Sequence, residues 1–258
     1  MSFSISLQSE VLKTKRSASF WLSILAAAFM PVILFLALFF EPEGAVKELQ
    51  ANPWGTFFKW AYMPLSAFIF PMFVILICTL IPQIEYKNNA WKQVFASPQS
   101  LGNIFFSKFL TIHLIMFFFY LLFTGFMILS GLLTNVLNDQ FTFLQNSIDW
   151  NNMARLATKT YISILGISAI QYCLSLRFKN FIAPVGIGLA LMVLSIVAMN
   201  VHWRHIAKLP FAYPFLTTQS IERKGRPFLE NHELNSIGYF AAFLLIGFLD
   251  ARFRKEKG

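Results

Sequence analysis

The stretch that decides the fold is residues 109–133, FLTIHLIMFFFYLLFTGFMILSGLL, in which His113 is the only ionisable side chain. A bilayer core about 30 Å thick needs a helix of about 20 mostly apolar residues, because no water is present there to satisfy backbone polar groups. This run therefore predicts a membrane-spanning helix. The whole chain agrees, since 57% of its 258 residues are hydrophobic and 13% are charged, against about 25% charged in soluble domains.

Further apolar runs surround this one, and together they predict an all-α integral membrane protein with six transmembrane helices in a single domain, residues 1–258. The expected spans are approximately 20–40, 61–81, 109–133, 157–176, 181–201 and 234–253. The fourth and sixth are the shortest, because Tyr161–Leu176 has 16 uncharged residues and Ile237–Leu249 has 13. The predicted fourth span therefore includes one more helical turn, residues 157–160, before this run.

The distribution of basic residues predicts the orientation of these spans. With the N-terminus inside, 12 of the 21 Lys and Arg fall in the cytoplasmic stretches beside four acidic residues, so eight of the nine net positive charges lie on that side. An excess of Lys and Arg is typical of cytoplasmic loops. Both termini are thus expected to be cytoplasmic, and the net charge needs no nucleic-acid partner.

Several catalytic and redox motifs are missing from the sequence. The 12 glycines form no phosphate-binding loop, and there is no Gly-x-Ser-x-Gly or His-Glu-x-x-His motif. No Asp or Glu lies inside the six apolar cores, which disfavours an ion-coupled carrier. Cys78 and Cys173 fall inside apolar runs and are expected to be free core residues. We therefore predict that the chain is not itself an enzyme and that a separate subunit supplies any energy.

The four histidines are weak candidates for chemistry. His113 stands alone in the third span, and an intramembrane enzyme would need a second catalytic group at similar depth, so we expect it to serve in helix packing. His202 and His205, with His232 further on, lie in the long outer connection 202–236. Their spacing could fit a metal, but neighbouring aromatic and basic residues favour an interfacial or re-entrant segment. Two prolines, Pro210 and Pro214, are expected to break that segment into short pieces.

The cytoplasmic connection after the second span, residues 84–98, reads IEYKNNAWKQVFASP. Trp91, Val94 and Phe95 fall on one face of a short helix, which Pro98 ends. Such a helix could fit a groove on a cytoplasmic partner, with its aromatic residues as anchors. It could equally lie in the lipid headgroups.

The N-terminal segment has a similar amphipathic character. Phe3, Leu7 and Val11 are spaced by four residues, which predicts an interfacial helix along the cytoplasmic leaflet. Basic residues follow it just before the membrane, as expected at that surface. They are Lys13, Lys15 and Arg16.

With these features the chain resembles a permease subunit of the ABC-2 class of ATP-binding-cassette transporters, and most of all the bacterial lantibiotic-immunity and bacteriocin-export permeases. The resemblance covers the layout of the whole chain. It is most specific at Ser9–Ser17 followed by Phe20 and Trp21, and at Glu85–Pro98 with Lys108 further on.

This resemblance implies that the loop helix between the second and third spans couples the permease to an ATPase. The residues to which it assigns ATPase coupling are Glu85, Trp91, Lys92, Val94, Phe95 and Pro98. It also implies a pathway near the second and fifth spans, whose helices contain Pro64, Pro71, Pro82 and Pro184.

The resemblance further implies a dimer with a second copy or a sister permease, resting on two copies of a cytoplasmic ABC ATPase that binds the ATP and Mg. The expected role is export of an amphipathic or hydrophobic peptide, lipid-like compound or drug across the bacterial cytoplasmic (inner) membrane. The alternative is a non-transporting scaffold that recruits a cytoplasmic or periplasmic machine through the same loops. ATPase association distinguishes the two.

Overall fold

The computed structural model describes residues 2–87, 99–220 and 227–253, and within them every regular element is a helix. The α-helices are α1 (Phe3–Thr14), α2 (Ala18–Phe40), α3 (Pro42–Leu49), α4 (Pro53–Pro64), α5 (Phe70–Lys87), α7 (Leu101–Leu137), α8 (Trp150–Arg177), α9 (Ile182–Asn200), α10 (Tyr213–Ser220) and α11 (Asn231–Phe253). Three shorter segments are a π-helix, η1 (Leu65–Ile69), and two 3-10 helices, η2 (Ile206–Lys208) and η3 (Pro210–Ala212).

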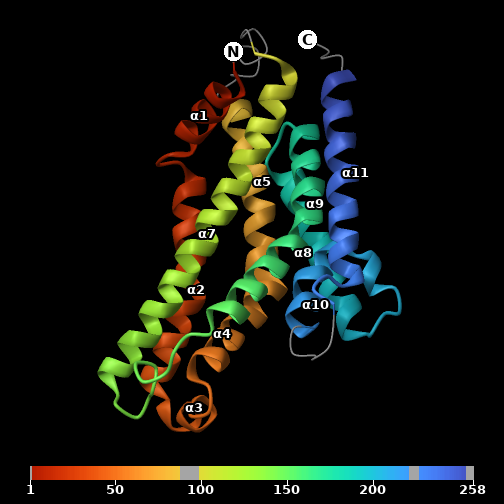
Figure 1. The fold of residues 1–258 in the computed structure, drawn as a ribbon. Helices are drawn as coiled ribbons and strands as arrows, with labels where there is room; N and C mark the ends of the chain where they lie inside the picture. Colours follow the sequence, from red (N-terminus) through yellow and green to blue (C-terminus); the bar gives the residue numbers. More distant parts are fainter. Residues whose placement is uncertain (1, 88–98, 221–226, 254–258) are drawn as a thin grey trace.

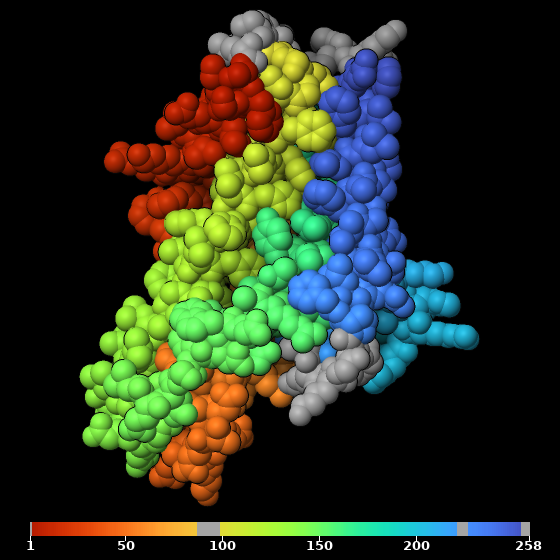
Figure 2. Space-filling view, viewed as in Figure 1, coloured from red at the N-terminus to blue at the C-terminus, as the bar shows by residue number. Residues whose placement is uncertain are grey.

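The helices form an elongated bundle in which α1 and the end of α11 lie at the same end (Figure 1). We call this the terminal end, and the other, where α3 lies, the opposite end. On one side α2 packs along α7, and on the other α8 packs along α11 and α10. Between them α5 contacts α2, α7, α8 and α9. In the space-filling view α11 forms a column along one edge, with α8 visible between it and α7 (Figure 2).

In the described part of the chain, five helical segments are long and apolar enough to cross a membrane. They include α2 and α9, which coincide closely with the predicted first and fifth spans, and α11, which begins a few residues before the predicted sixth.

The second and third spans are longer than the sequence predicts. The second runs as one helix from Pro53 to Tyr86, against the expected 61–81, and α7 is a 37-residue helix that contains the expected 109–133. Side-chain caps set the early starts: Asn52 accepts a hydrogen bond from the Gly55 N–H at 2.9 Å, and Ser100 accepts one from the Asn103 N–H at 3.2 Å. Between each cap and its apolar run no proline breaks the helix. Pro53 lies in the first turn of α4, where proline is tolerated.

The second span changes its helical pitch where two prolines fall close together. Pro64 ends α4, the five residues of η1 are π-helical, and Pro71 follows in the first turn of α5. Proline lacks an N–H and cannot close the usual ladder, so a wider turn accommodates the mismatch. Two of the prolines that the sequence places in the second span therefore flank a π-helical turn.

The predicted fourth span, 157–176, lies within α8, which is not among the five apolar segments. The reason is that polar side chains lower the mean hydropathy of α8. These side chains are buried inside the bundle. Gln171 is fully buried, and its amide donates to the Pro184 carbonyl of α9 at 2.7 Å and to the Thr79 hydroxyl of α5 at 3.3 Å. This central helix is therefore held by hydrogen bonds as well as by apolar packing.

The connection after α9 folds into η2, η3 and α10, with Pro210 as the first residue of η3 and Pro214 inside the first turn of α10. The two prolines thus break the segment into short helices, as the sequence predicts. Phe211 and Tyr213 from these pieces are buried against the bundle.

Candidate functional site

Most residues predicted to couple the chain to an ATPase lie outside the described residues. They are Trp91, Lys92, Val94, Phe95 and Pro98. The structure does describe Glu85, near the end of α5, and Gln99 and Ser100, which lead into α7. The candidate site is therefore built from the two places where the chain enters and leaves residues 88–98, and from what packs against them.

The N-terminal helix α1 packs against this region with its polar face. Its buried residues are Ser6, Glu10 and Thr14, at positions i, i+4 and i+8. The apolar side chains face outward instead, with Ile5 50% and Val11 40% exposed. The sequence predicts an amphipathic interfacial helix here, and the structure adds that its polar stripe contacts the protein, so its apolar stripe is free to face lipid.

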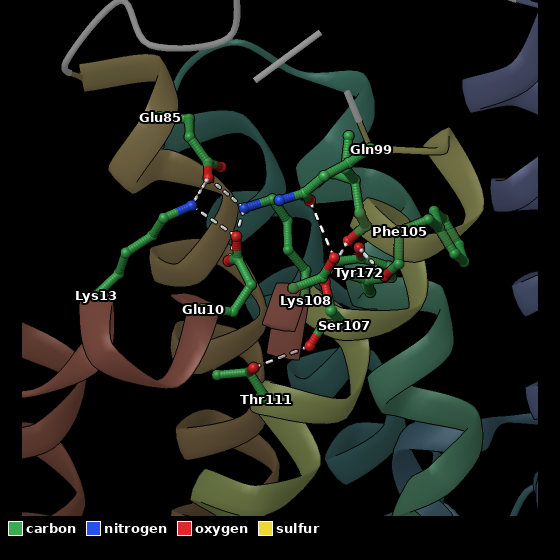
Figure 3. A network of polar contacts seen from close by, with 11 residues as sticks. Glu10, Lys13, Glu85, Gln99, Phe105, Ser107, Lys108, Thr111 and Tyr172 are labelled. Carbon is green, nitrogen blue, oxygen red and sulfur yellow. Dashed lines mark hydrogen bonds and ion pairs between the residues drawn. The ribbon is translucent and has the colours of Figure 1, made fainter. Parts of the chain in front are cut away.

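Four charged residues from α1, α5 and α7 form a closed ring of ion pairs, which we call the stem ring (Figure 3). Lys13 Nζ donates to Glu10 Oε1 at 2.6 Å and to Glu85 Oε1 at 3.0 Å. Lys108 Nζ donates to Glu10 Oε2 at 2.8 Å and also to Glu85 Oε1. Cations and anions therefore alternate around the ring, and its net charge is zero.

The stem ring is largely withdrawn from solvent. The side chains of Lys108 and Glu85 are 1% and 2% exposed, whereas that of Lys13 is 34% exposed. Removing one partner from a buried pair leaves an uncompensated charge, which typically costs about 3 to 5 kcal/mol. The remaining oxygen of Glu85, Oε2, is buried, forms no hydrogen bond with the described residues and points away from both lysines (Figure 3).

Lys13 closes the ring on its more exposed side. Burial lowers the pKa of this lysine, but the hydrogen bonds and negative charges of Glu10 and Glu85 outweigh burial and raise the pKa above its usual 10.5. Lys13 is therefore positively charged at neutral pH. Lys15 and Arg16, which the sequence groups with it, are exposed, and Arg16 has a left-handed backbone with φ of 62° at the turn into α2.

Other hydrogen bonds near the stem ring join the neighbouring helices to one another. Ser6 on α1 donates to the side-chain oxygen of Gln99 at 3.1 Å. The Tyr86 hydroxyl donates to the Leu176 carbonyl of α8 at 3.0 Å, and the Tyr172 hydroxyl of α8 donates to the Phe105 carbonyl of α7 at 2.9 Å. The residues that flank 88–98 are therefore hydrogen-bonded to α1, through Gln99, and to α8, through Tyr86.

A second buried polar cluster lies toward the opposite end, where α8, α10 and α11 meet. Lys159 Nζ is 3.4 Å from Glu233 Oε1, and both side chains are buried. The Thr217 hydroxyl donates to the same oxygen at 3.1 Å and therefore accepts from His232 Nε2 at 3.0 Å, which puts a proton on that nitrogen. The Glu230 N–H donates to Glu233 Oε2 at 2.8 Å.

The remaining candidates from the sequence have plain structural roles. His113 Nδ1 is 2.7 Å from the Tyr161 hydroxyl, a partner that the sequence did not indicate, and it packs beside Phe109. Cys78 and Cys173 are free, as predicted. Among the described residues, no group of three or more His, Cys, Asp and Glu is arranged to hold a metal ion.

A comparison with protein-family models decides the family. Residues 6–195, from α1 to α9, match the model described as ABC-2 family transporter protein, which is well over half of the 258-residue chain. The chain belongs to the ABC-2 transporter family. No curated protein and no solved structure matched.

An ABC-2 family chain is the permease component of an ABC transporter, which lacks an ATPase motif of its own and generally works with a cytoplasmic ABC ATPase. The match begins inside α1, so most of α1 and all four residues of the stem ring lie within the matched region. The resemblance to lantibiotic-immunity permeases is a finer assignment that the family match leaves open.

Sequence reasoning identified Glu85 and Lys13 but not the ring that joins them. Glu10 entered only as part of a family-like stretch, and Lys108 only as a charge ahead of the third span. Two signals could have found them. Ser6, Glu10 and Thr14 form a polar stripe of helical spacing, and Lys108 is a lone cation between apolar turns, which requires an anionic partner if the helix continues through it.

Proposed function

We propose that this chain is the membrane-spanning permease subunit of an ATP-driven exporter and that the stem ring transmits movement of the partner ATPase to the membrane helices. The ring itself carries the proposal. It joins α1 to α5 and α7 close to the two points where the chain enters and leaves residues 88–98, the segment expected to dock on the ATPase. A flexible connection would absorb such movement by bending. A buried ring that links three helices resists bending, because separating its members exposes unpaired charge.

The proposed assembly has six spans, with α8 as the fourth and both termini in the cytoplasm. Two permease subunits, identical or sister chains, rest on two ATPase copies that bind the ATP and Mg. The expected cargo is an amphipathic or hydrophobic molecule, exported across the bacterial inner membrane. The polar interior of α8 supports its assignment as a span, since polar groups in a membrane helix face the bundle interior.

Docking is tested by co-expressing the tagged permease with the ABC ATPases of its source organism and purifying the complex. The Trp91→Ala/Phe95→Ala variant should lose the ATPase while still inserting into the membrane. Trp150→Ala is the control, because Trp150 is an aromatic residue that is 59% exposed and starts α8 toward the opposite end. Co-purification unchanged by Trp91→Ala/Phe95→Ala would overturn the docking assignment. A wild-type complex without any ATPase would favour the scaffold alternative.

Transmission is tested separately with Glu85→Gln/Lys108→Met, which removes the charges without leaving one buried and unpaired. We expect this variant to retain the ATPase and its ATP hydrolysis. Adding ATP should change backbone hydrogen exchange in α4 and α10 of the wild type but not of the variant. If the variant responds like the wild type, the ring does not transmit movement.

A further inference from the structure

A pocket of about 390 Å³ lies between α4, α8 and α10, at the other end of the molecule from the stem ring. This volume falls within the range of small-molecule sites, roughly 300 to 1,000 Å³. The residues that line it are Asn52, Trp54, Gly55, Thr56, Phe58, Lys59, Tyr62, Ile148, Asp149, Asn152, Met153, Leu156 and Thr218.

The pocket runs along the starts of α4 and α8. From Asn52, the cap of α4, to Tyr62 near its end the lining spans a rise of about 15 Å at 1.5 Å per residue. On the other side the lining runs from Ile148, just before α8, to Asn152 and Leu156 within it. The pocket is therefore an elongated slot between two helices, and Thr218 of α10 closes part of its wall.

The lining changes character along this slot. Polar side chains lie at the starts of α4 and α8, where Asn52, Asp149 and Asn152 are exposed. Deeper residues such as Phe58 and Leu156 are apolar and at least half-buried. Asp149 is already engaged as the cap of α8, since it accepts hydrogen bonds from the N–H and the side chain of Asn152. A molecule that fills the slot thus needs an apolar body.

The deep end of the slot is not purely apolar. Tyr62 is fully buried, and its hydroxyl forms no hydrogen bond with the described residues. Two further buried hydroxyls, of Tyr120 on α7 and Thr160 on α8, meet no hydrogen-bond criterion with the described residues. Buried polar groups in proteins are almost always paired, so an orphan hydroxyl beside a cavity indicates a missing partner. A lipid tail cannot supply one.

We propose that this slot binds an uncharged amphipathic molecule, with its apolar body between α4 and α8 and a hydroxyl or carbonyl group hydrogen-bonded to the Tyr62 hydroxyl. An uncharged ligand fits because the buried polar group at the deep end, the Tyr62 hydroxyl, is neutral, whereas the lining cation Lys59 is exposed. A second polar group on such a molecule would meet the polar side chains at the helix starts. Binding needs no ATPase, and only the view of this molecule as export cargo rests on the proposed function.

The test uses the permease alone in lipid nanodiscs and two photoreactive probes. One is a ten-carbon α,ω-diol with a diazirine in mid-chain, and the other is the same chain without hydroxyls. Mass spectrometry locates the labelled residues. We expect saturable labelling by the diol of peptides within residues 52–62 and 148–156, competed by unlabelled 1,10-decanediol. The hydrocarbon probe should label mainly outward-facing residues such as Leu245 and Ile246 of α11.

Two variants and their controls make the result decisive. Tyr62→Phe removes only the hydroxyl and should weaken pocket labelling by the diol about five-fold, the effect of one neutral hydrogen bond. Tyr239→Phe is its control, because the Tyr239 hydroxyl donates to the Lys208 carbonyl outside the pocket. Leu156→Trp should fill the slot and abolish labelling, whereas Leu121→Trp, on an outward face of α7, should not.

Equal pocket labelling by the two probes, or labelling unchanged in Tyr62→Phe, would overturn the proposal. If Leu156→Trp does not fold, Tyr62→Phe and the probe pair still decide the matter. Because no ATPase is present, a negative result here leaves the permease assignment intact. Loss of the ATPase interaction would likewise leave binding in the slot intact.

Discussion

The two buried charge clusters of this protein stabilise their ionised groups in different ways. In the stem ring the carboxylates of Glu10 and Glu85 accept their hydrogen bonds from Lys13 and Lys108. Their negative charges are therefore stabilised by these two lysines. At the opposite end Glu233 has Lys159, but it also accepts hydrogen bonds from the Thr217 hydroxyl and the Glu230 N–H.

The difference predicts how each cluster responds to the loss of a lysine. Loss of one lysine from the stem ring leaves two carboxylates sharing a single cation. Loss of Lys159 leaves one carboxylate with two neutral donors still in place. The stem ring is therefore the more sensitive of the two to a change of charge, which fits the proposed transmission of movement. The opposite-end cluster is better suited to holding α8, α10 and α11 together.

The largest effect is expected for Lys108→Met. This change leaves Glu10 and Glu85 with only the partly exposed Lys13, and it should lower the free energy of unfolding by about 3 to 5 kcal/mol. Thermal melting of the purified protein in detergent measures the loss. Lys108→Met/Glu85→Gln should recover much of it, because the Glu10–Lys13 pair remains neutral overall. A single variant that melts like the wild type would contradict the ring.

A smaller loss, about 2 kcal/mol, is expected for Lys159→Met. The carboxylate of Glu233 keeps its two neutral donors, which offset part of the cost of an unpaired charge. The same melting assay applies, and Lys159→Met/Glu233→Gln serves as the charge-free control. A loss as large as that of Lys108→Met would remove the distinction between the two clusters.

The smallest effect is expected for Lys13, because its side chain is 34% exposed and solvent screens its ion pairs. Its pKa is raised in the folded protein, so its contribution is fully present below the unfolded-state value of 10.5 and is lost as pH rises through the folded-state value. Melting of the wild type and of Lys13→Met should therefore differ at pH 8 and converge only when pH has risen past the folded-state pKa, which lies above 10.5. A gap that persists at high pH would show that Lys13 acts through packing alone.

Much of the membrane architecture was predictable because it depends on local composition. Apolar runs long enough to cross a bilayer show directly in α2, α7 and α9, and proline positions show where helices shorten or change pitch. Helix ends were predicted less well. Caps such as Asn52 and Ser100 extend the second and third spans beyond their apolar cores, and α8 gave a weak signal because its interior face is polar.

The candidate site was predictable only in part. The segment predicted to dock on an ATPase was recognisable by its aromatic spacing, and Glu85 by its place in that stretch. The partners Glu10 and Lys108 are 75 and 23 residues from Glu85 in the chain, and no local pattern relates residues at such separations. The orphan hydroxyl of Tyr62 was equally hidden, since whether a tyrosine is paired depends on helices that meet only in the folded bundle.

By itself the sequence determined that lipid is the solvent and that the chain is helical, because composition and run length are properties of the chain alone. It predicted, but did not determine, an energy source on another subunit. Only the tertiary structure decided which face of α1 turns inward and which charges meet. The physical reason is that a charge can be buried only where opposite charge arrives from elsewhere in the chain, and that pairing depends on how the helices pack.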